Sequence, residues 1–580
     1  MFVIATAGHV DHGKSALLRA LTGMEPDRWE EERRRGLTID LGFVWMRGTH
    51  GPIAFVDVPG HEKFVGNMLA GVGPVPAVLF VVAADEGWMP QSAEHLTALD
   101  ALGVHHGLLA VTKADLMEPD LAAEEALAEI GRTSLGEVPW VAVSARTGEG
   151  LGPLRTALDD VTARLPASDA TAPTRLWVDR AFTIRGAGLV VTGTLAAGRI
   201  LLGDTLELAR TGKRYVVREI QSMNEHVAEA TGVARVALNL RGARRGDVVR
   251  GDALLTVGTF RCTTVADVRT RLCLPDDLPP QILVHIGAAT VDCRVRPLGA
   301  DTARLTFGEA LPLRVGDRLV LRHDRGVAGG AVVLDADPAA LNRRGAARRR
   351  SADLEGFADV PDGMAELVRR GIVRQATLRE VGIEPPVPAL VGDWLVAPDL
   401  GRQLTDRLSE LAAARVADPS APPLRVDDAR KALALPDVHL VAALLPAGWS
   451  IRDGMIVSAD APDTLAPAVR LAVETLEARS EGFVVPTEEE LASLGLAAGP
   501  IAAAVRAERL VRLAADVVLT ARSVDAAVGL LTNLPQPFTA GQAREALHTS
   551  RKVVVPLLEH LAREGRTRRD GDAGHRVTGR

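Results

Sequence analysis

The first residues of chemical interest form a loop bounded by two glycines. Four residues separate these glycines, and a Lys and a Ser follow directly, in the order Gly8-His9-Val10-Asp11-His12-Gly13-Lys14-Ser15. In this phosphate-binding pattern the backbone N–H groups close around phosphates, the Lys14 ammonium faces the β- and γ-phosphate oxygens, and the Ser15 hydroxyl is a ligand for Mg²⁺. We therefore predict a site for a nucleoside triphosphate with Mg²⁺.

Two later segments supply groups that act on the terminal phosphate. Thr38 ends the segment Arg35-Gly36-Leu37-Thr38 and offers a hydroxyl and a carbonyl to Mg²⁺ and the γ-phosphate. In Asp57-Val58-Pro59-Gly60-His61, Asp57 is expected to hold Mg²⁺ through water and the Gly60 N–H to reach the γ-phosphate. His61 is the candidate catalytic residue, because it would orient the attacking water. A His after a Gly is more often structural, but the preceding Asp and Gly favour catalysis by positioning here.

A third pair of segments predicts the choice of base. Asp115, in Thr112-Lys113-Ala114-Asp115, would accept hydrogen bonds from both N–H groups of guanine, and Ser144-Ala145-Arg146 would complete the base site. Adenine lacks this pair of donors, so the carboxylate would stay partly unsatisfied and GTP is favoured over ATP. The usual motif begins with Asn. Thr112 therefore leaves one hydrogen bond around the base and the loop open, but not the Asp115 contact.

The elements that must position these motifs are alternating strands and helices. Apolar stretches at 2–7, 52–56, 107–111 and 140–143 predict strands that lead into the motifs, and the helix-forming residues 16–21 follow the first loop. We therefore predict an α/β P-loop GTP-binding domain at residues 1–170.

Composition limits what the rest of the chain does. With 580 residues the chain is too long for one core, so several domains are expected. Its net charge of -7 gives no general sign of a polyanion-binding surface, so any nucleic-acid contact must be local. Cys262, Cys273 and Cys293 fit neither a metal knuckle nor a disulfide framework. Without a basic leader or a long apolar run, we expect a soluble, cytoplasmic, monomeric protein with no targeting or membrane segment.

The GHVDHGK loop, the RGLTID segment and the DVPGH element together resemble the translational GTPases of the elongation factor Tu class. Residues 61–71 and 83–91, and the Thr-Lys-Ala-Asp variant, look most like the bacterial selenocysteine-specific elongation factors. The resemblance implies ribosome-stimulated GTP hydrolysis. It also implies that Val10 and Leu37 form an apolar gate that keeps His61 from the nucleotide until the ribosome docks.

Alternating apolar segments and glycine turns predict a β-barrel at 174–255, and a second β-rich segment at 258–340 resembles the family's second barrel. By the resemblance, the first barrel holds the aminoacyl end of tRNA in a pocket of Asp179, Arg180, Phe182, Thr192 and Arg235. Ordinary elongation factors carry a carboxylate where this chain has Arg180, and Asn where it has Arg235.

The two arginines have a chemical reason to be in that pocket. A thiol has a pKa of about 8.5, and a selenol is more acidic, so selenocysteine is an anion near pH 7 while cysteine and serine are largely neutral. Guanidinium groups would select the charged side chain. The alternative is that both arginines are solvated strand residues.

Helix-forming composition replaces the β-rich pattern after a basic run, Arg343 to Arg350, which contacts RNA or is a solvated linker at 341–352. Short strand–turn–strand units are then expected at Trp394–Val396, Met455–Val457, Asp516–Val518 and His575–Val577. Their last residues, Val396, Val457, Val518 and Val577, recur with separations of 61, 61 and 59 residues. This period predicts an array of four α+β winged-helix modules, at 353–398, 399–460, 461–522 and 523–580. The family resemblance implies that the array binds a messenger hairpin.

Only the last module has a basic surplus, with nine Lys or Arg against five Asp or Glu in residues 541–580. Phe, Trp and Tyr are absent from this stretch, so phosphate and guanidinium contacts rather than base stacking would dominate. The candidate RNA residues are Ser550, Arg551, Lys552, Arg566, Arg568 and Arg569. A basic surface without RNA is the alternative.

The leading hypothesis is a GTPase that uses GTP and Mg²⁺, binds selenocysteyl-tRNA and the messenger hairpin, and acts on the ribosome at recoded UGA codons. A GTPase subunit of sulfate adenylyltransferase shares the first three domains, but the winged-helix tail argues against it. A nucleic-acid-binding regulator switched by GTP is the other alternative.

Overall fold

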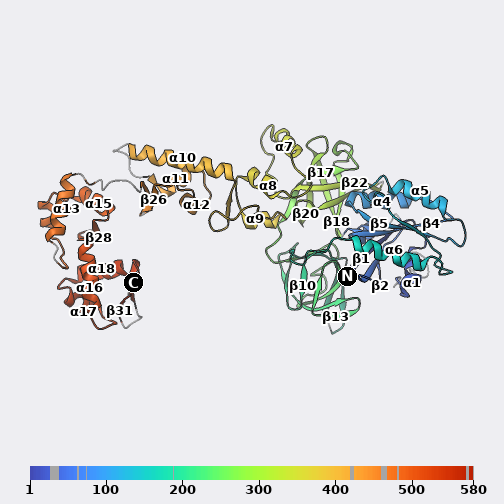
Figure 1. The fold of residues 1–580 in the computed structure, drawn as a ribbon, viewed down its shortest axis with the longest axis horizontal. Coiled ribbons are helices and arrows are strands. Elements are labelled where there is room, and N and C mark those ends of the chain that lie inside the picture. The colour runs from blue at the N-terminus through green and yellow to red at the C-terminus, as the bar shows by residue number, and fades with distance from the viewer. Residues whose placement is uncertain are drawn as a thin grey trace. The chain divides into compact units, whose positions relative to one another are not determined.

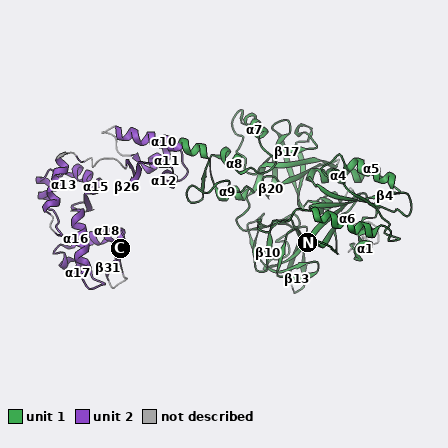
Figure 2. Cartoon of the chain, viewed as in Figure 1, with its two compact units in different colours: residues 1–403 green, residues 404–580 purple. Residues whose placement is uncertain are grey.

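A computed structural model describes residues 1–26, 38, 40–61, 64–73, 75–186, 188–324, 326–417, 424–452, 454–458, 465, 467–479, 482–569 and 574–578. The chain divides into two compact units, residues 1–403 and 404–580 (Figure 2). Each unit is described by itself. None of the described helices combines the length and the apolar character needed to span a membrane.

The first domain of unit 1 contains a six-stranded sheet in the order β2-β3-β1-β4-β5-β6. Figure 1 shows this domain in blue and labels its strands β1, β2, β4 and β5. Its strands are β1 (Phe2–Ala7), β2 (Gly42–Gly48), β3 (Gly51–Asp57), β4 (Ala77–Ala83), β5 (His106–Thr112) and β6 (Trp140–Ala142). All neighbours are parallel except β2, which runs antiparallel to β3. The strands predicted from apolar stretches are confirmed, because central strands covered on both faces must be apolar along their whole length.

Helices cover both faces of this sheet and build two separate cores. The helices are α1 (Lys14–Thr22), α3 (Val65–Val72), α4 (Pro90–Leu102), α5 (Asp120–Ile130) and α6 (Leu151–Arg164). Ile4 and Leu79 face a core shared with α1 and α6, whereas Val3 and Phe80 face one shared with α3, α4 and α5. The alternation of neighbouring strand residues between the faces explains this division.

Two barrels follow, as predicted. In the first, the ring is formed by β7 (Arg175–Trp177), β9 (Gly188–Leu195), β11 (Thr205–Leu208), β12 (Arg214–Ser222), β15 (Ala234–Arg241) and β16 (Ala253–Thr256), and β8 (Arg180–Ile184) pairs with β9 outside it. The second is a closed barrel of β17 (Cys262–Arg271), β18 (Gln281–Ile286), β19 (Ala289–Pro297), β20 (Thr302–Pro312), β21 (Arg318–His323) and β22 (Gly326–Asp335).

The segment expected to be a basic linker is instead part of a folded element. Helix α7 (Ala346–Glu355) includes the end of the 341–352 range, and its Arg350 is buried. The Arg350 guanidinium lies 2.6 Å from Asp267 on β17 and 2.6 Å from Asp335 on β22. Arg350 is thus neither solvated nor available to RNA, because two buried carboxylates of the second barrel hold it.

The first winged-helix module also departs from the predicted arrangement. Its strands β23 (Ile372–Arg374) and β24 (Trp394–Val396) pair antiparallel, but helix α9 (Gln375–Glu380) lies between them in sequence. The strand–turn–strand unit expected at Trp394 is therefore wrong. Helix α8 (Gly363–Arg370) precedes β23. The elements of this module therefore follow one another in the order α7, α8, β23, α9 and β24.

Unit 2 contains the remaining modules, each with three helices and a small antiparallel sheet of two or three strands. The second module consists of α10 (Pro398–Ala417), which begins in unit 1, α11 (Val426–Ala432), α12 (His439–Ala443) and the strands β25 (Leu424–Arg425), β26 (Trp449–Arg452) and β27 (Met455–Ser458). The third consists of α13 (Pro467–Arg479), α14 (Glu488–Ser493), α15 (Ala498–Arg506), β28 (Leu510–Ala514) and β29 (Val517–Thr520). The fourth consists of α16 (Ala521–Thr532), α17 (Ala540–Ala546), α18 (Arg551–Arg563), β30 (Thr567–Arg569) and β31 (His575–Val577). The predicted winged-helix array is confirmed.

Candidate functional site

The phosphate-binding loop runs from the end of β1 to the start of α1. Gly13 caps α1 in the left-handed conformation, with φ 83°. Gly8 is required by space, since a Cβ there would lie 2.1 Å from the Val81 carbonyl oxygen. Lys14 is buried, and its Nζ donates to the carbonyl oxygens of Gly8 at 2.9 Å and His9 at 2.6 Å. Burial lowers the pKa of Lys14 to about 8.

The three residues predicted to bind Mg²⁺ lie together at one end of this loop. Ser15 Oγ is 2.6 Å from Asp57 Oδ2 and 2.9 Å from Thr38 Oγ1. Asp57 is fully buried, and the Thr6 hydroxyl donates to its other oxygen at 2.9 Å. Hydroxyl and carboxylate oxygens are the hard ligands that Mg²⁺ prefers. The side chains present therefore fit this ion.

Helix α4 holds the loop through two side chains that sequence analysis did not assign. The Val10 N–H donates to Gln91 Oε1 at 3.0 Å, and the Gly8 N–H donates to Nδ1 of the buried His95 at 3.1 Å. Burial, with the positive charge of Lys14, lowers the pKa of His95 to about 3, so this ring is neutral and can accept. His12 is also buried and has its pKa lowered to about 4.

The base-binding segments line one cavity beside the loop. Thr112, Lys113, Asp115, Ala145 and Arg146 line a space of about 440 Å³ together with Gly13, Ala16, Arg19, Ala20 and Leu116. Asp115 accepts from the Ser144 hydroxyl at 2.6 Å and from Arg146 at 2.6 and 2.9 Å, and the Ser144 bond is the main cause of its lowered pKa. Ala16, Arg19, Ala20 and Leu116 were not among the predicted residues.

The Thr that replaces Asn keeps a bond to the loop. Thr112 is buried, and its hydroxyl donates to the His12 carbonyl oxygen at 2.7 Å. The hydrogen bond left open by the sequence thus has a partner on the loop side.

Gly60, which is predicted to reach the γ-phosphate, lies against the phosphate-binding loop. Gly60 is packed so closely that a Cβ would come within 2.6 Å of both Lys14 Nζ and the Val10 nitrogen. His61 follows, half-buried, with its ring 5.9 Å from that of Phe64. Arg35, Gly36 and Leu37 lie outside the described residues, so the apolar gate of Val10 and Leu37 stays a prediction.

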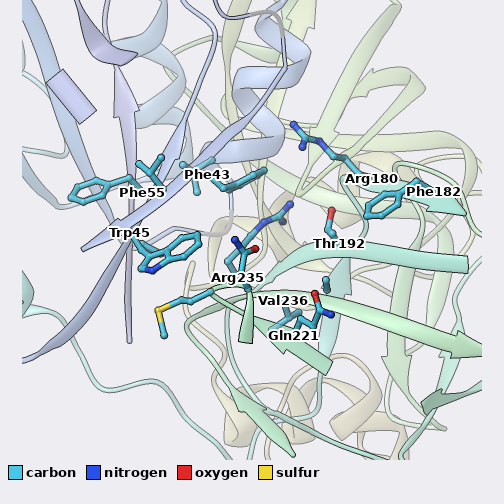
Figure 3. A pocket seen from close by; sticks show the side chains of 15 residues that line it. Phe43, Trp45, Phe55, Arg180, Phe182, Thr192, Gln221, Arg235 and Val236 are labelled. Carbon is cyan, nitrogen blue, oxygen red and sulfur yellow. The ribbon is translucent and has the colours of Figure 1, made fainter. Parts of the chain in front are cut away.

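The predicted aminoacyl pocket lies between the first barrel and the edge strand β2 (Figure 3). Arg180, Phe182, Thr192 and Arg235 line a space of about 170 Å³ with Phe43, Trp45 and Phe55 of the GTP-binding domain. Register explains the convergence, since Arg180 faces Thr192 across β8 and β9, and Arg235 faces Thr194 across β15 and β9.

Both arginines of this pocket have partners, so neither is a freely solvated strand residue. Asp179 is buried and accepts from Thr192 Oγ1 at 2.7 Å and from both terminal nitrogens of Arg235. Arg235 also stacks on Phe43, with its guanidinium carbon 3.8 Å from the ring centre. Figure 3 labels both side chains at the pocket. Arg180 pairs with Asp40 at 2.9 Å.

In the last module, the predicted RNA residues surround helix α18 and the following strands. Ser550 is the N-cap of α18, although its side chain makes no capping hydrogen bond. Arg551 is exposed, whereas Lys552 pairs with Asp516 and Arg566 lies 2.7 Å from Asp525. Arg568 and Arg569 are exposed on β30. The structure therefore places these cations on one module and gives Lys552 and Arg566 acidic partners.

Comparison with known proteins agrees with this geometry. Residues 1–164 match the Elongation factor Tu GTP binding domain, residues 279–340 the beta-barrel domain of the Selenocysteine-specific elongation factor, and residues 530–576 the winged helix of Elongation factor SelB. The fold and the nucleotide site are those of a GTP-binding translation factor of the elongation factor Tu class.

Relatives of this class narrow the assignment. The Selenocysteine-specific elongation factor of Escherichia coli (strain K12) is 40% identical over 352 residues, or 59% of this chain and 56% of that protein. Elongation factor 1-alpha of Methanopyrus kandleri is 32% identical, with 43% of this chain and 69% of that protein covered. The chain matches little more than half the length of the selenocysteine-specific relatives from Escherichia coli and Desulfomicrobium baculatum.

One solved structure matches a larger share of the chain than these relatives do. The crystal structure of a bacterial selenocysteine-specific elongation factor, EF-Sec, matches 100% of both chains with a TM-score of 0.73 and 25% identity. That of SelB from Methanococcus maripaludis with the GTP analogue GppNHp, at 22% identity and TM-score 0.51, covers 58% of this chain and supports the fold alone. The chain belongs to the translational GTPases of the elongation factor Tu class, and among them it is similar to the selenocysteine-specific elongation factors.

Proposed function

We propose that this protein binds GTP with Mg²⁺, carries selenocysteyl-tRNA to ribosomes at recoded UGA codons, and hydrolyses GTP there. Its C-terminal winged helices would guide it by binding a messenger hairpin. The observation that carries this proposal is the pair of arginines, Arg180 and Arg235, in a half-enclosed pocket beside the GTP-binding domain.

The GTP-binding domain has the groups that this chemistry needs. Lys14 and the loop N–H groups would hold the phosphates, and Ser15, Thr38 and Asp57 would hold Mg²⁺, which neutralises charge that develops on the phosphate oxygens. Asp115 and Ser144 would bind guanine. His61 would orient the attacking water, and the reaction would depend on the position of that water rather than on a covalent intermediate.

The pocket would select the amino acid by charge. A selenolate carries a full negative charge near pH 7, whereas a seryl hydroxyl does not, and a guanidinium binds an anion much more strongly than a neutral hydroxyl. Phe43 and Trp45 restrict water at the pocket, which strengthens this electrostatic preference. The winged-helix match at 530–576 supports the hairpin part of the proposal and disfavours a sulfate adenylyltransferase subunit.

The test compares two aminoacyl groups on one tRNA body. Arg180→Ala combined with Arg235→Ala should weaken selenocysteyl-tRNA binding while barely changing seryl-tRNA binding, because only the former offers an anionic side chain. Dissociation constants measured with GTP present give the selectivity ratio. Equal losses for both tRNAs would show that these arginines hold the tRNA backbone instead.

A further inference from the structure

We propose that Asp40 sets the selectivity of the aminoacyl pocket by competing with the substrate side chain for Arg180. This inference rests on the proposed function. It adds a residue from the GTP-binding domain to a pocket whose charged residues otherwise come from the barrel.

Asp40 lies at the contact between the two domains. Its Oδ2 is 2.9 Å from Nη2 of Arg180, and its Oδ1 is 3.8 Å from Nη1 of Arg250. The carbonyl oxygen of the next residue, Leu41, also accepts from Arg180. The side chains of Asp40 and Arg180 keep only 22% and 20% of their surface exposed, so their attraction is less screened than that of a surface pair.

The charges of the pocket make this carboxylate a direct competitor. Among the described residues in and beside the pocket, the printed ion pairs join Arg180, Arg235 and Arg250 to Asp40 and Asp179, so three positive groups meet two negative ones. A selenolate that approaches Arg180 must share the guanidinium with Asp40 and is repelled by it. Neutralising Asp40 would double the excess positive charge from one to two.

Asp179 cannot play the same part. It belongs to the barrel, is buried, and is fixed by Thr192 and Arg235 of that barrel. Asp40 instead belongs to the other domain, so its distance from Arg180 changes whenever the two domains or the segment around it shift.

The position of Asp40 in the chain ties it to the nucleotide site. Thr38 lies two residues earlier, with its hydroxyl 2.9 Å from Ser15 Oγ in the predicted Mg²⁺ site. On the other side, Gly42 is fixed in the sheet opposite Asp57. Because successive Cα atoms are about 3.8 Å apart, Thr38 and Asp40 are within about 7.6 Å of one another. Because the connection is this short, we expect a displacement of Thr38 to move Asp40 relative to Arg180.

The test is Asp40→Asn, which removes the charge and keeps the size. Loss of a partly buried competing pair should raise the selectivity for selenocysteyl-tRNA over seryl-tRNA by roughly three- to tenfold. The same substitution should reduce the ratio of selenocysteyl-tRNA affinities measured with GTP and with GDP. Asp40→Glu, which keeps the charge, should leave the selectivity near that of the parent protein.

Three controls make the result specific. Glu207→Gln removes one negative charge from the first barrel, which also carries Arg180. Glu207 lies 3.3 Å from Arg214, and its substitution should leave the selectivity unchanged. In an Arg180→Ala background, Asp40→Asn should have no further effect, as a double-mutant cycle requires. Guanine-nucleotide binding verifies that each variant is folded, and Asp40→Ser is a second neutral variant should Asn fail this check.

The outcomes separate this inference from the proposed function. Unchanged selectivity in the neutral Asp40 variants, with the expected loss in Arg180→Ala, would overturn the role of Asp40 and leave the proposed pocket standing. Unchanged selectivity in the neutral Asp40 variants and in Arg180→Ala would overturn both the role of Asp40 and the proposed pocket. A change in Asp40→Asn that persists without Arg180 would also count against competition for that guanidinium.

Discussion

At the scale of single residues, Thr112 shows how a changed side chain keeps one function of a motif. The Asn that usually occupies this position has an amide, whereas Thr112 has a hydroxyl with a single donor. That donor lies 2.7 Å from the His12 carbonyl oxygen in the phosphate-binding loop, and both residues are buried. The hydroxyl thus links the base-binding strand to the loop.

This bond predicts the effect of Thr112→Val. Valine has nearly the same shape but no donor, so the buried His12 carbonyl would lose a partner at a cost of about 1 kcal/mol, or roughly a fivefold loss of GTP affinity. Thr112→Ser keeps the hydroxyl and should bind GTP almost normally. Equilibrium titration with a fluorescent GTP analogue measures both variants, and equal affinity of the Val variant and the parent protein would show that the bond does not hold the loop.

Residues of the nucleotide site were predictable from sequence where the contact is local. The loop from Gly8 to Ser15 is continuous, so its pattern alone identifies it. Gln91 and His95 contact the same loop from 81 and 87 residues away. Neither has a motif of its own, since any polar side chain at the right point of α4 could serve as the acceptor. Asp40 and Phe43 were also not predicted as site residues, because their partners belong to another domain.

At the scale of elements, helix α7 shows why a basic run is a poor guide to its surroundings. Arg343, Arg344, Arg348 and Arg349 are exposed as expected of charged residues, but Arg350 points into the second barrel. Asp267 also accepts from Arg304, and Asp335 lies within 3.7 Å of Arg369 and Arg370 on α8. These carboxylates lie up to 83 residues from Arg350 in sequence, so no local pattern distinguishes it from its neighbours.

This network predicts a large effect of Arg350→Met on stability. Removing one partner from a buried ion pair typically costs about 3–5 kcal/mol. The lower end, about 3 kcal/mol, is expected here because both carboxylates keep another arginine. The urea midpoint of unfolding of unit 1 should fall. Arg349→Ala, on the exposed side of the same helix, is the matched control and should leave the midpoint almost unchanged. Similar midpoints for both variants would mean that Arg350 contributes no net stability.

At the scale of the whole molecule, the order of domains was predictable because each has its own pattern of apolar residues. The period of the tail predicted the later strand pairs, which recur at β27, β29 and β31. It did not predict the insertion of α9 between β23 and β24, since a regular spacing of one strand says nothing about where its partner lies. Neighbouring modules are also less independent of one another than a regular period suggests.

The last two modules in fact share a core. Leu519 of β29 is fully buried in the same apolar cluster as Leu531, Phe538 and Leu557 of the final module, and Val511 of β28 packs against that cluster. Cutting the chain after residue 522 would expose this cluster. A cut at the border between the compact units, after Gln403, leaves that cluster out of the truncated protein altogether and removes all but the first six residues of α10.

A protein that ends at Gln403 should therefore bind GTP and aminoacyl-tRNA as the full chain does but should not bind the messenger hairpin. Within the full chain, Arg551→Ala should weaken hairpin binding. If Arg551 contacts a phosphate, the slope of log affinity against log salt should become shallower by about 0.7 to 0.9. If it contacts a base edge, the slope should hold while sequence preference relaxes.

Lys552 should contribute less than Arg551, because Asp516 already neutralises it and raises its pKa. Asp516→Asn should accordingly strengthen hairpin binding, since it frees Lys552 for a phosphate. Arg522→Ala, which removes an exposed cation from α16 of the same module, is the control and should leave affinity unchanged. Titrations of labelled hairpin at several salt concentrations test all these variants together. Full affinity in the protein that ends at Gln403 would move the RNA site to the exposed arginines of α7, Arg348 and Arg349, or to the first module.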